Sequence, residues 1–157
     1  MSQKLQPYRN DEVGFSLPIP ADWEVTEGVS GCAVVAVAPG EDLRHFRPNV
    51  VVTVERLPDG ESLDAWTRRS REALGENLNQ LQFFDTEETQ IDSVPARRTL
   101  SHYLHRFHGG VNLEQWSAAK GGWGYVVSCS TAATDYDDLA DVMVSIADGL
   151  RVEGVPA

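Results

Sequence analysis

Two segments of this chain carry apolar residues on one helical face only, and this feature restricts the fold more than any other. Their apolar residues recur at steps of three and four, which is the spacing of an amphipathic helix. The first stripe, behind a predicted N-cap at Ser62, consists of Leu63, Trp66, Ser70, Leu74, Leu78 and Leu81. The second helix begins near Thr134 or Asp135, and its stripe consists of Leu139, Val142, Met143, Ile146, Ala147 and Leu150. Because each helix has a single apolar face, each must cover another layer of structure.

The remaining segments read as short strands and supply that layer. Strands are predicted at residues 13–17, 23–26, 32–38, 49–57, 87–91, 99–107, 111–119 and 123–131. The pairs Gly109-Gly110 and Gly121-Gly122 indicate tight hairpins, because glycine tolerates the positive φ of a two-residue turn. Strands joined so closely must be antiparallel. The Pro18-Ile19-Pro20 segment is expected at an edge or a turn, and Val94-Pro95 is expected to interrupt the strand at 87–91.

These elements predict an α+β fold, in which the two helices lie on an antiparallel sheet. The length of 157 residues is that of one domain. We expect residues 1–12, which are mostly polar, to form a loosely ordered N-terminal segment. Residues 13–152 are expected to form the single domain, and residues 153–157 a tail.

The chain is strongly acidic, with 13 Lys+Arg against 24 Asp+Glu and a formal net charge of −11. Nucleic acids and anionic membranes bind basic surfaces, so neither is an expected partner. The sequence has no apolar run of the roughly 18 residues that a membrane-spanning helix needs, and its first residues lack the features of a secretory signal. Together these observations predict a cytoplasmic protein without membrane insertion.

Three histidines, His102, His105 and His108, follow one another at three-residue steps. On a strand, His102 and His105 point to opposite faces, and His102 and His108 stand about 20 Å apart along one face. Zinc ligands must each lie within about 2.1 Å of the ion, so no metal site is expected. A helix would bring His105 and His108 together, but the adjacent glycine hairpin favours a strand.

Signatures of catalysis and cofactor binding are missing from the sequence. It contains neither the G-x-S-x-G nucleophile elbow nor the glycine-rich loops that cradle phosphates, and no calcium-loop pattern. The carboxylates of the C-terminal segment are explained by solvation and by the dipole of the second helix. The two cysteines, Cys32 and Cys129, are interpreted as buried thiols, with a disulfide as the alternative. No catalytic residue, cofactor or metal ligand is therefore predicted.

Aromatic residues around the last hairpin are the one candidate for a binding surface. They are Tyr103, Trp116, Trp123 and Tyr125, with Phe107 on a neighbouring strand. One interpretation places them in the sheet core or in cross-strand pairs. The other places them in an apolar patch that contacts a protein partner, because aromatic residues are enriched at binding hot spots. The sequence leaves both interpretations open.

Five segments in a fixed order form a pattern: FSLPIPADWEV, FRPNVVVTVERLP before the first helix, SVPARR, YVVSCSTA and DLADVMVSIADGL. From Val13 to Val152 this pattern resembles the PsbP-like α/β/α sandwich superfamily, and most closely its actinobacterial LpqN/LpqT-type branch. The resemblance implies a single PsbP-like domain with a curved antiparallel sheet flanked by two main helices. It also implies a non-catalytic role, since the relatives include photosystem extrinsic subunits, a Ran-GTPase-binding nuclear factor and adaptor chaperones of type VI secretion.

Three functions stay open at this point. The leading hypothesis is a non-catalytic protein-binding or chaperone-like adaptor module of a bacterial cytoplasm, linked to secretion. Its protein partner is expected to be basic or hydrophobic, and a homodimer is left open. The alternative is a small-molecule or lipid carrier with a pocket between sheet and helix. The third is an enzyme that combines His102 or His108 with a carboxylate.

Overall fold

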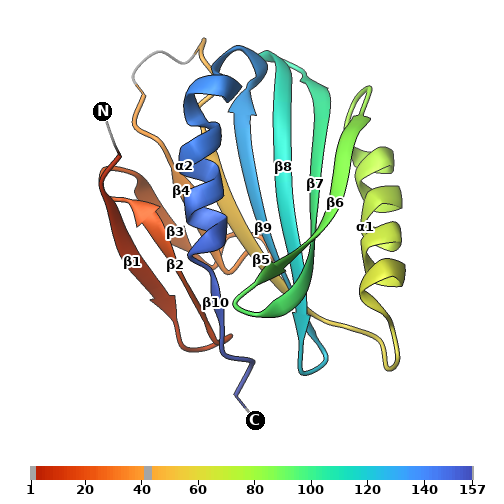
Figure 1. Ribbon diagram of the computed structural model, residues 1–157. Coiled ribbons are helices and arrows are strands. Elements are labelled where there is room, and N and C mark those ends of the chain that lie inside the picture. The colour runs from red at the N-terminus through yellow and green to blue at the C-terminus, as the bar shows by residue number, and fades with distance from the viewer. Residues whose placement is uncertain (1–2, 41–43, 157) are drawn as a thin grey trace.

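The computed structural model describes residues 3–40 and 44–156. Within these residues, two antiparallel sheets and two α-helices form an α+β fold (Figure 1). The helices are α1 (Leu63–Asn77) and α2 (Tyr136–Asp148), and the 3-10 turn η1 (Ala133–Asp135) precedes α2. The strands are β1 (Leu5–Asn10), β2 (Phe15–Pro20), β3 (Glu24–Glu27), β4 (Val34–Val37), β5 (Asn49–Arg56), β6 (Gln82–Ile91), β7 (Val94–His105), β8 (Gly109–Lys120), β9 (Trp123–Ala132) and β10 (Arg151–Val152). Neither helix of the described ranges is long and apolar enough to cross a lipid bilayer.

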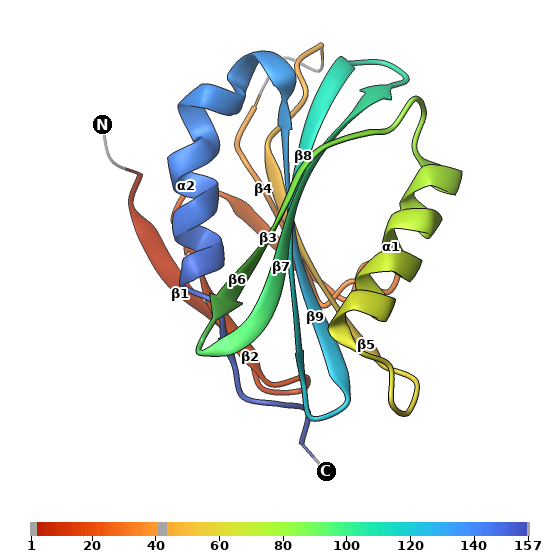
Figure 2. The same cartoon turned by 45° about the vertical axis from the view of Figure 1, so that its right-hand side comes forward.

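The larger sheet has the strand order β3-β4-β5-β9-β8-β7-β6, and the smaller sheet has the order β1-β2-β10. All neighbouring strands in both sheets are antiparallel. Figure 2 shows the large sheet nearly edge-on and curved, with α2 on one side and α1 on the other. The predicted α+β fold, an antiparallel sheet flanked by two main helices, is thereby confirmed.

The main hydrophobic core lies between the large sheet, α2 and the small sheet. The apolar stripe of α2 packs into this core, where Met143, Ile146 and Leu150 are buried. Phe15 of β2 packs edge-on against Tyr125 of β9, with ring centroids 6.4 Å apart. Each Å² of apolar surface removed from water contributes about 25 cal/mol. This burial holds α2 and the small sheet firmly to one face of the large sheet.

Helix α1 covers the opposite face and is attached mainly through Trp66. Ser62 is its N-cap, as predicted, because the Ser62 Oγ accepts a hydrogen bond of 3.1 Å from the backbone N–H of Ala65. Within α1, all of whose residues are described, only Trp66 is buried. Its indole Nε1 donates to Glu55 Oε1 on β5 at 2.6 Å, and its ring lies against the backbone of Gly124 on β9. The leucines of the predicted stripe are half-buried, so α1 buries much less apolar surface than α2.

The turn between β6 and β7 differs from the sequence prediction. Asp92 and Ser93 form a two-residue turn with φ of 52° and 62°, which is the backbone shape that suits a tight hairpin. The predicted interruption at Val94-Pro95 is therefore wrong. Pro95 pairs with Gln90 near the beginning of β7, where a missing N–H is tolerated.

The β7–β8 hairpin exists, but its loop lies earlier than predicted. His105 pairs with Gly109, so the loop consists of residues 106–108 and the two glycines belong to β8. Gly109 has a φ of 76°, a left-handed backbone conformation that glycine adopts without steric cost. The Gly121-Gly122 turn joins β8 to β9 as predicted, with both φ values positive.

The expected loosely ordered N-terminal segment contains strand β1, which corrects that expectation. Strand β1 pairs with β2 over its full length, so Pro18 and Pro20 lie inside a paired strand rather than in a turn. Pro18 stands opposite Pro7. Proline has no backbone N–H, so this pair suits a position of the antiparallel ladder at which neither residue donates a hydrogen bond to the opposite strand. Among the described residues, β10 pairs with β2 only at Phe15 and Ser16. Beyond Ser16 this side of β2 is an edge, where proline costs no ladder hydrogen bond.

Candidate functional site

The two faces of the large sheet differ in chemistry, and this difference locates the first candidate site. On the face that α2 covers, side chains such as Trp116 and Val127 are buried in the hydrophobic core. Beneath α1, strands β5, β7 and β8 present hydroxyl and amide side chains, which are Thr53, Thr99, Gln115 and Ser117. A helix on such a polar surface gains little from excluding water, and openings remain along α1.

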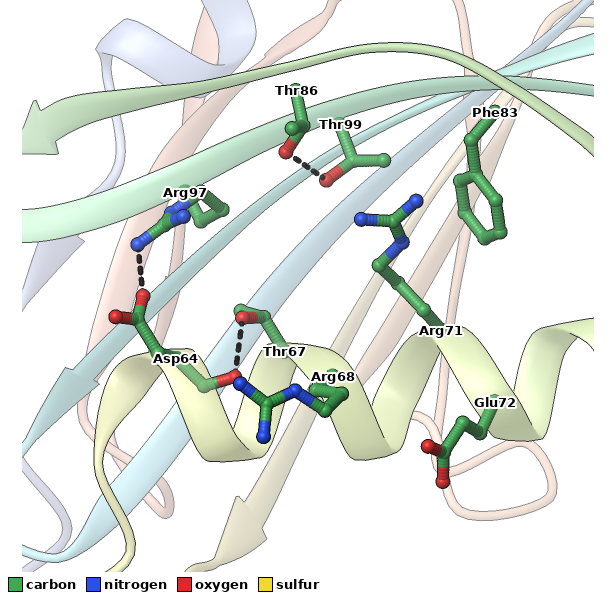
Figure 3. A pocket seen from close by; sticks show the side chains of 9 residues that line it. All are labelled: Asp64, Thr67, Arg68, Arg71, Glu72, Phe83, Thr86, Arg97 and Thr99. Atoms are coloured by element: carbon green, nitrogen blue, oxygen red, sulfur yellow. Dashed lines mark hydrogen bonds and ion pairs between the residues drawn. The ribbon is translucent and has the colours of Figure 1, made fainter.

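The larger opening is a groove of about 450 Å³ between α1, β6 and β7, which we call the α1 groove (Figure 3). It is lined by Asp64, Thr67, Arg68, Arg71, Glu72, Phe83, Thr86, Arg97 and Thr99. A second opening of about 330 Å³ lies between α1, β5 and β8 and includes Glu55, Arg69 and Gln115. The hydroxyl, guanidinium and carboxylate groups of the α1 groove suit a polar ligand better than a lipid chain.

Arg97 and Arg71 bring guanidinium groups into the α1 groove from opposite walls. Arg97, on β7, forms a short ion pair with Asp64 of α1 and a longer one, at 3.5 Å, with Glu88 of β6. The Nε of Arg97 is buried and has no hydrogen-bond partner. Arg71, on α1, lies over the ring of Phe83 with its guanidinium carbon 4.1 Å from the ring centroid. Figure 3 shows both guanidinium groups in the space between α1 and the sheet.

The second candidate site lies where the β4–β5 loop meets the β7–β8 hairpin. We call it the aromatic end and define it by Phe46, Phe84, His102, His105, Phe107 and His108. The Phe46 ring contacts the rings of His105 and His108, with centroids 5.7 and 5.9 Å apart, and the two imidazoles are 4.7 Å apart. The Nδ1 of His108 lies 3.3 Å from the carbonyl oxygen of Arg44. These contacts hold the loop against the hairpin.

Two phenylalanine rings of the aromatic end are exposed. Phe107, at the tip of the hairpin, is 78% exposed, and Phe84 is 57% exposed. The backbone N–H of Phe107 donates to His105 Nδ1 at 3.1 Å, and the Arg106 guanidinium lies 5.5 Å from the centroid of the Phe107 ring. Phe84 stacks on His102 with centroids 5.8 Å apart. Exposed aromatic rings are typical of protein-binding surfaces.

The aromatic residues selected from the sequence lie elsewhere. Trp116 and Tyr125 are buried in the core, with exposures of 4% and 0%, so they cannot contact a partner. Trp123 is half-buried against the core, with the Arg56 guanidinium 6.0 Å from its ring centroid. Tyr103 is half-buried, and burial raises the pKa of its phenol. By strand alternation Tyr103 and Trp116 lie on opposite faces of the sheet, so these four residues do not form one patch.

The aromatic end has a weak signal in the sequence. The segments RHFR (residues 44–47) and HRFH (residues 105–108) both combine histidine, arginine and phenylalanine. The sequence predicts a strand that includes residues 105–107, because the glycine pair at 109–110 has the pattern of a turn. Once the loop is placed at residues 106–108, Phe107 becomes a hairpin-tip residue with no layer to cover it.

The histidines are arranged differently from the expectation. His105 and His108 do meet, although in a hairpin loop rather than in a helix. His102 stays within β7 and stacks on Phe84. In the described ranges, no group of three or more His, Cys, Asp and Glu side chains could hold a metal ion.

A buried ion pair supports the sheet on the side of α2. Arg98 Nε donates to Glu114 Oε2 at 2.6 Å, and Arg98 Nη1 donates to Asp85 Oδ2 at 3.0 Å. Burial opposes the charge of Arg98, but pairing with Glu114 prevails and raises the pKa of the guanidinium. Burial, together with the charge of Glu114 on the neighbouring strand, raises the pKa of the Cys129 thiol. Cys129 and the half-buried Cys32 are both free thiols.

Comparison with known proteins identifies similar folds. No family model and no curated protein matches the chain. Cyanobacterial PsbP (CyanoP) from Synechocystis sp. PCC 6803 superimposes with a TM-score of 0.72 at 17% identity, over 97% of this chain and 94% of that one. LpqN of Mycobacterium tuberculosis, involved in cell envelope biogenesis, gives 0.70 at 16% identity over 96% and 91%. The Ran-binding protein Mog1p of Saccharomyces cerevisiae gives 0.67 at 11% identity over 96% of each chain.

Proposed function

We propose that this chain, which has a PsbP-like fold, is a non-catalytic protein-binding module that contacts its partner through the aromatic end. The observation that carries the proposal is the 78% exposure of Phe107 at the tip of a hairpin. Covering an exposed aromatic ring removes apolar surface from water and so gains hydrophobic free energy. Mog1p, which shares the fold, is a Ran-binding protein, and this supports a protein-binding use of such a scaffold.

The partner is expected to present an apolar side chain next to a carboxylate. Phe107 offers apolar contact area, and the guanidinium of Arg106 beside it can hold a carboxylate through two parallel hydrogen bonds. Aromatic residues and arginine supply much of the binding energy in protein interfaces. The net charge of −11 favours a partner that is basic or hydrophobic as a whole, so the carboxylate that Arg106 holds would be one local group in the contact.

We extend the proposal to a chaperone-like adaptor of a bacterial cytoplasm, linked to secretion. Its support is the sequence resemblance to PsbP-like proteins, some of which are secretion adaptors, together with the acidic composition. LpqN, by contrast, is involved in cell envelope biogenesis, so a partner exposed only in the envelope would argue against the cytoplasmic location. A lipid carrier has less support, because the α1 groove is lined by threonine, arginine and carboxylate side chains.

Site-specific photo-crosslinking in cells tests the binding surface. A photoreactive phenylalanine analogue is placed at Phe107 and, as a matched control, at Val144 on α2, whose side chain is 38% exposed. We expect a single protein to be cross-linked from position 107 and not from position 144. A cross-link to a second copy of this chain would identify a homodimer and contradict a distinct partner.

The purified partner then gives a quantitative test. Phe107→Ala is expected to weaken binding about 30-fold, the effect of a hot-spot residue worth about 2 kcal/mol. The free energy of unfolding should not change, because the ring lies outside the core. Equal dissociation constants for Phe107→Ala and Val144→Ala would rule out the aromatic end as the binding surface.

A further inference from the structure

We infer that the α1 groove binds the oxyanion of a small soluble organic acid, a carboxylate or a phosphate, between Arg71 and Arg97. The two guanidinium groups come from different elements, α1 and β7, and both line the same groove. In the view of Figure 3, the hydroxyls of Thr86 and Thr99 lie between them on the sheet wall. Arginine forks and hydroxyl donors are the groups that proteins use to hold carboxylate and phosphate oxygens.

Arg97 has a donor that the protein itself leaves unused. Its Nη2 is engaged by Asp64 and Glu88, but its Nε is buried without any hydrogen-bond partner. A buried donor without an acceptor destabilises the folded protein. Because this Nε has no accessible surface in the empty groove, an oxyanion contacts it only after the Arg97 side chain turns toward the groove; without that turn Arg97 contributes its positive charge to the groove wall.

Arg71 is held in place without being neutralised. Within the described part of the chain, its guanidinium contacts the Phe83 ring rather than a carboxylate. Stacking on an aromatic ring fixes the plane of the guanidinium and leaves its N–H edges free to donate. A preorganised arginine binds an anion with a smaller loss of side-chain entropy than a mobile one.

The charge and size of the groove restrict the ligand further. Its lining contains three arginines against Asp64 and Glu72, so the groove is locally cationic on a chain of net charge −11. Its volume of about 450 Å³ exceeds what a single inorganic anion fills and lies within the range of small-molecule sites. The Phe83 ring offers a flat surface for the remainder of such a ligand.

Nuclear magnetic resonance of the full chain tests this inference through the arginine Nε–Hε signals. Sodium phosphate and sodium succinate are titrated separately, against sodium chloride of matched ionic strength. We expect saturable shifts of the Arg71 and Arg97 signals and of the Thr99 amide with at least one of the two acids. Response to phosphate alone would identify a phosphate ligand, response to succinate alone a carboxylate ligand, and response to both a general oxyanion site.

Two variants make the test decisive. Arg71→Gln is expected to weaken binding roughly fivefold or more. Arg56→Gln removes another arginine that lies over an aromatic ring, that of Trp123, and is expected to leave binding unchanged. The inference would be overturned if the signal shifts with phosphate and succinate matched those with sodium chloride, or if they were equally large in Arg71→Gln. Either result would show ionic screening only. These outcomes do not depend on whether Phe107 binds a protein.

Discussion

Replacing Gly124 with alanine tests whether α1 is held to the sheet through Trp66. Gly124 lies in β9 at the point where the Trp66 ring packs against the backbone. A Cβ built on Gly124 would lie 2.5, 2.6 and 2.9 Å from three atoms of the six-membered ring of Trp66. Carbon atoms in contact stay about 3.5–4.0 Å apart, so the indole must move by about 1 Å. That movement also strains the 2.6 Å hydrogen bond from Trp66 Nε1 to Glu55.

The expected cost follows from overpacking at a buried site. Inserting a methyl group into a well-packed contact destabilises a protein by roughly 1–3 kcal/mol. For a chain of this size, each kcal/mol lowers the melting temperature by about 2–4 °C. We therefore expect Gly124→Ala to lower the melting temperature by about 2–12 °C. The backbone of Gly124 does not need a positive φ, so the steric contact with Trp66 is the whole cause.

Thermal unfolding and amide hydrogen exchange measure the effect. Exchange should accelerate in α1 and stay unchanged in α2, because only α1 depends on Trp66. Gly75→Ala is the matched control: Gly75 lies in α1, and a Cβ there would meet no atom within 4 Å. This control should stabilise the protein by about 0.5–1 kcal/mol, since alanine favours a helix over glycine.

A second substitution separates the steric cause from any other. Phenylalanine at position 66 lacks the part of the indole that meets the added methyl group. Gly124→Ala should therefore cost less in the Trp66→Phe background than in the wild type, which is a non-additive double-mutant cycle. Two results would refute the role given to Trp66. One is a Gly124→Ala variant as stable as the wild type, with unchanged hydrogen exchange in α1. The other is a set of stability changes for Gly124→Ala and Trp66→Phe that simply add in the double variant.

Three further outcomes are expected. Glu114→Gln should destabilise the protein by about 3 kcal/mol in urea unfolding, because it removes the buried charge partner of Arg98; a loss below about 1 kcal/mol would mean that the ion pair is dispensable. With a thiol-specific disulfide reagent at pH 8, the half-buried Cys32 should react in the native protein. Cys129 is buried and the pKa of its thiol is raised, so it should react only after unfolding. Rapid reaction of both thiols in the native protein would contradict the burial of Cys129. Ser93→Gly should stabilise the protein by about 1 kcal/mol, because residue 93 has a φ of 62°; calorimetry that shows a lower melting temperature would disprove it.

The sequence predicts α2 and the antiparallel sheet well because their signals are local. The apolar stripe predicted for α2 is buried in the structure at Met143, Ile146 and Leu150. The Gly121-Gly122 turn makes β8 and β9 neighbouring antiparallel strands. The same kind of stripe in α1 is misleading. Its residues other than Trp66 are at most half-buried, because burial depends on the surface beneath the helix as well as on the helix itself.

The candidate sites depend on register, which a single sequence specifies poorly. In β8, Gln115 and Ser117 face α1 while Trp116 faces the core. This alternation is visible in the sequence, but it identifies a polar groove only when the helix above it is known. At the aromatic end, an error of two residues in the position of one turn moves Phe107 from a strand to an exposed tip. Both sites thus arise from long-range pairing rather than from local pattern.

The unequal attachment of the two helices bears on how the sites can act. Helix α2 is part of the hydrophobic core, whereas α1 contributes one buried side chain and otherwise lies over polar groups. A ligand in the α1 groove would therefore add contacts where the protein has few of its own. Binding to the folded state stabilises it by RT ln(1 + [L]/Kd), and this gain should appear first as slower exchange in α1. The aromatic end involves the β4–β5 loop and the β7–β8 hairpin instead, so partner binding there should leave exchange in α1 unchanged.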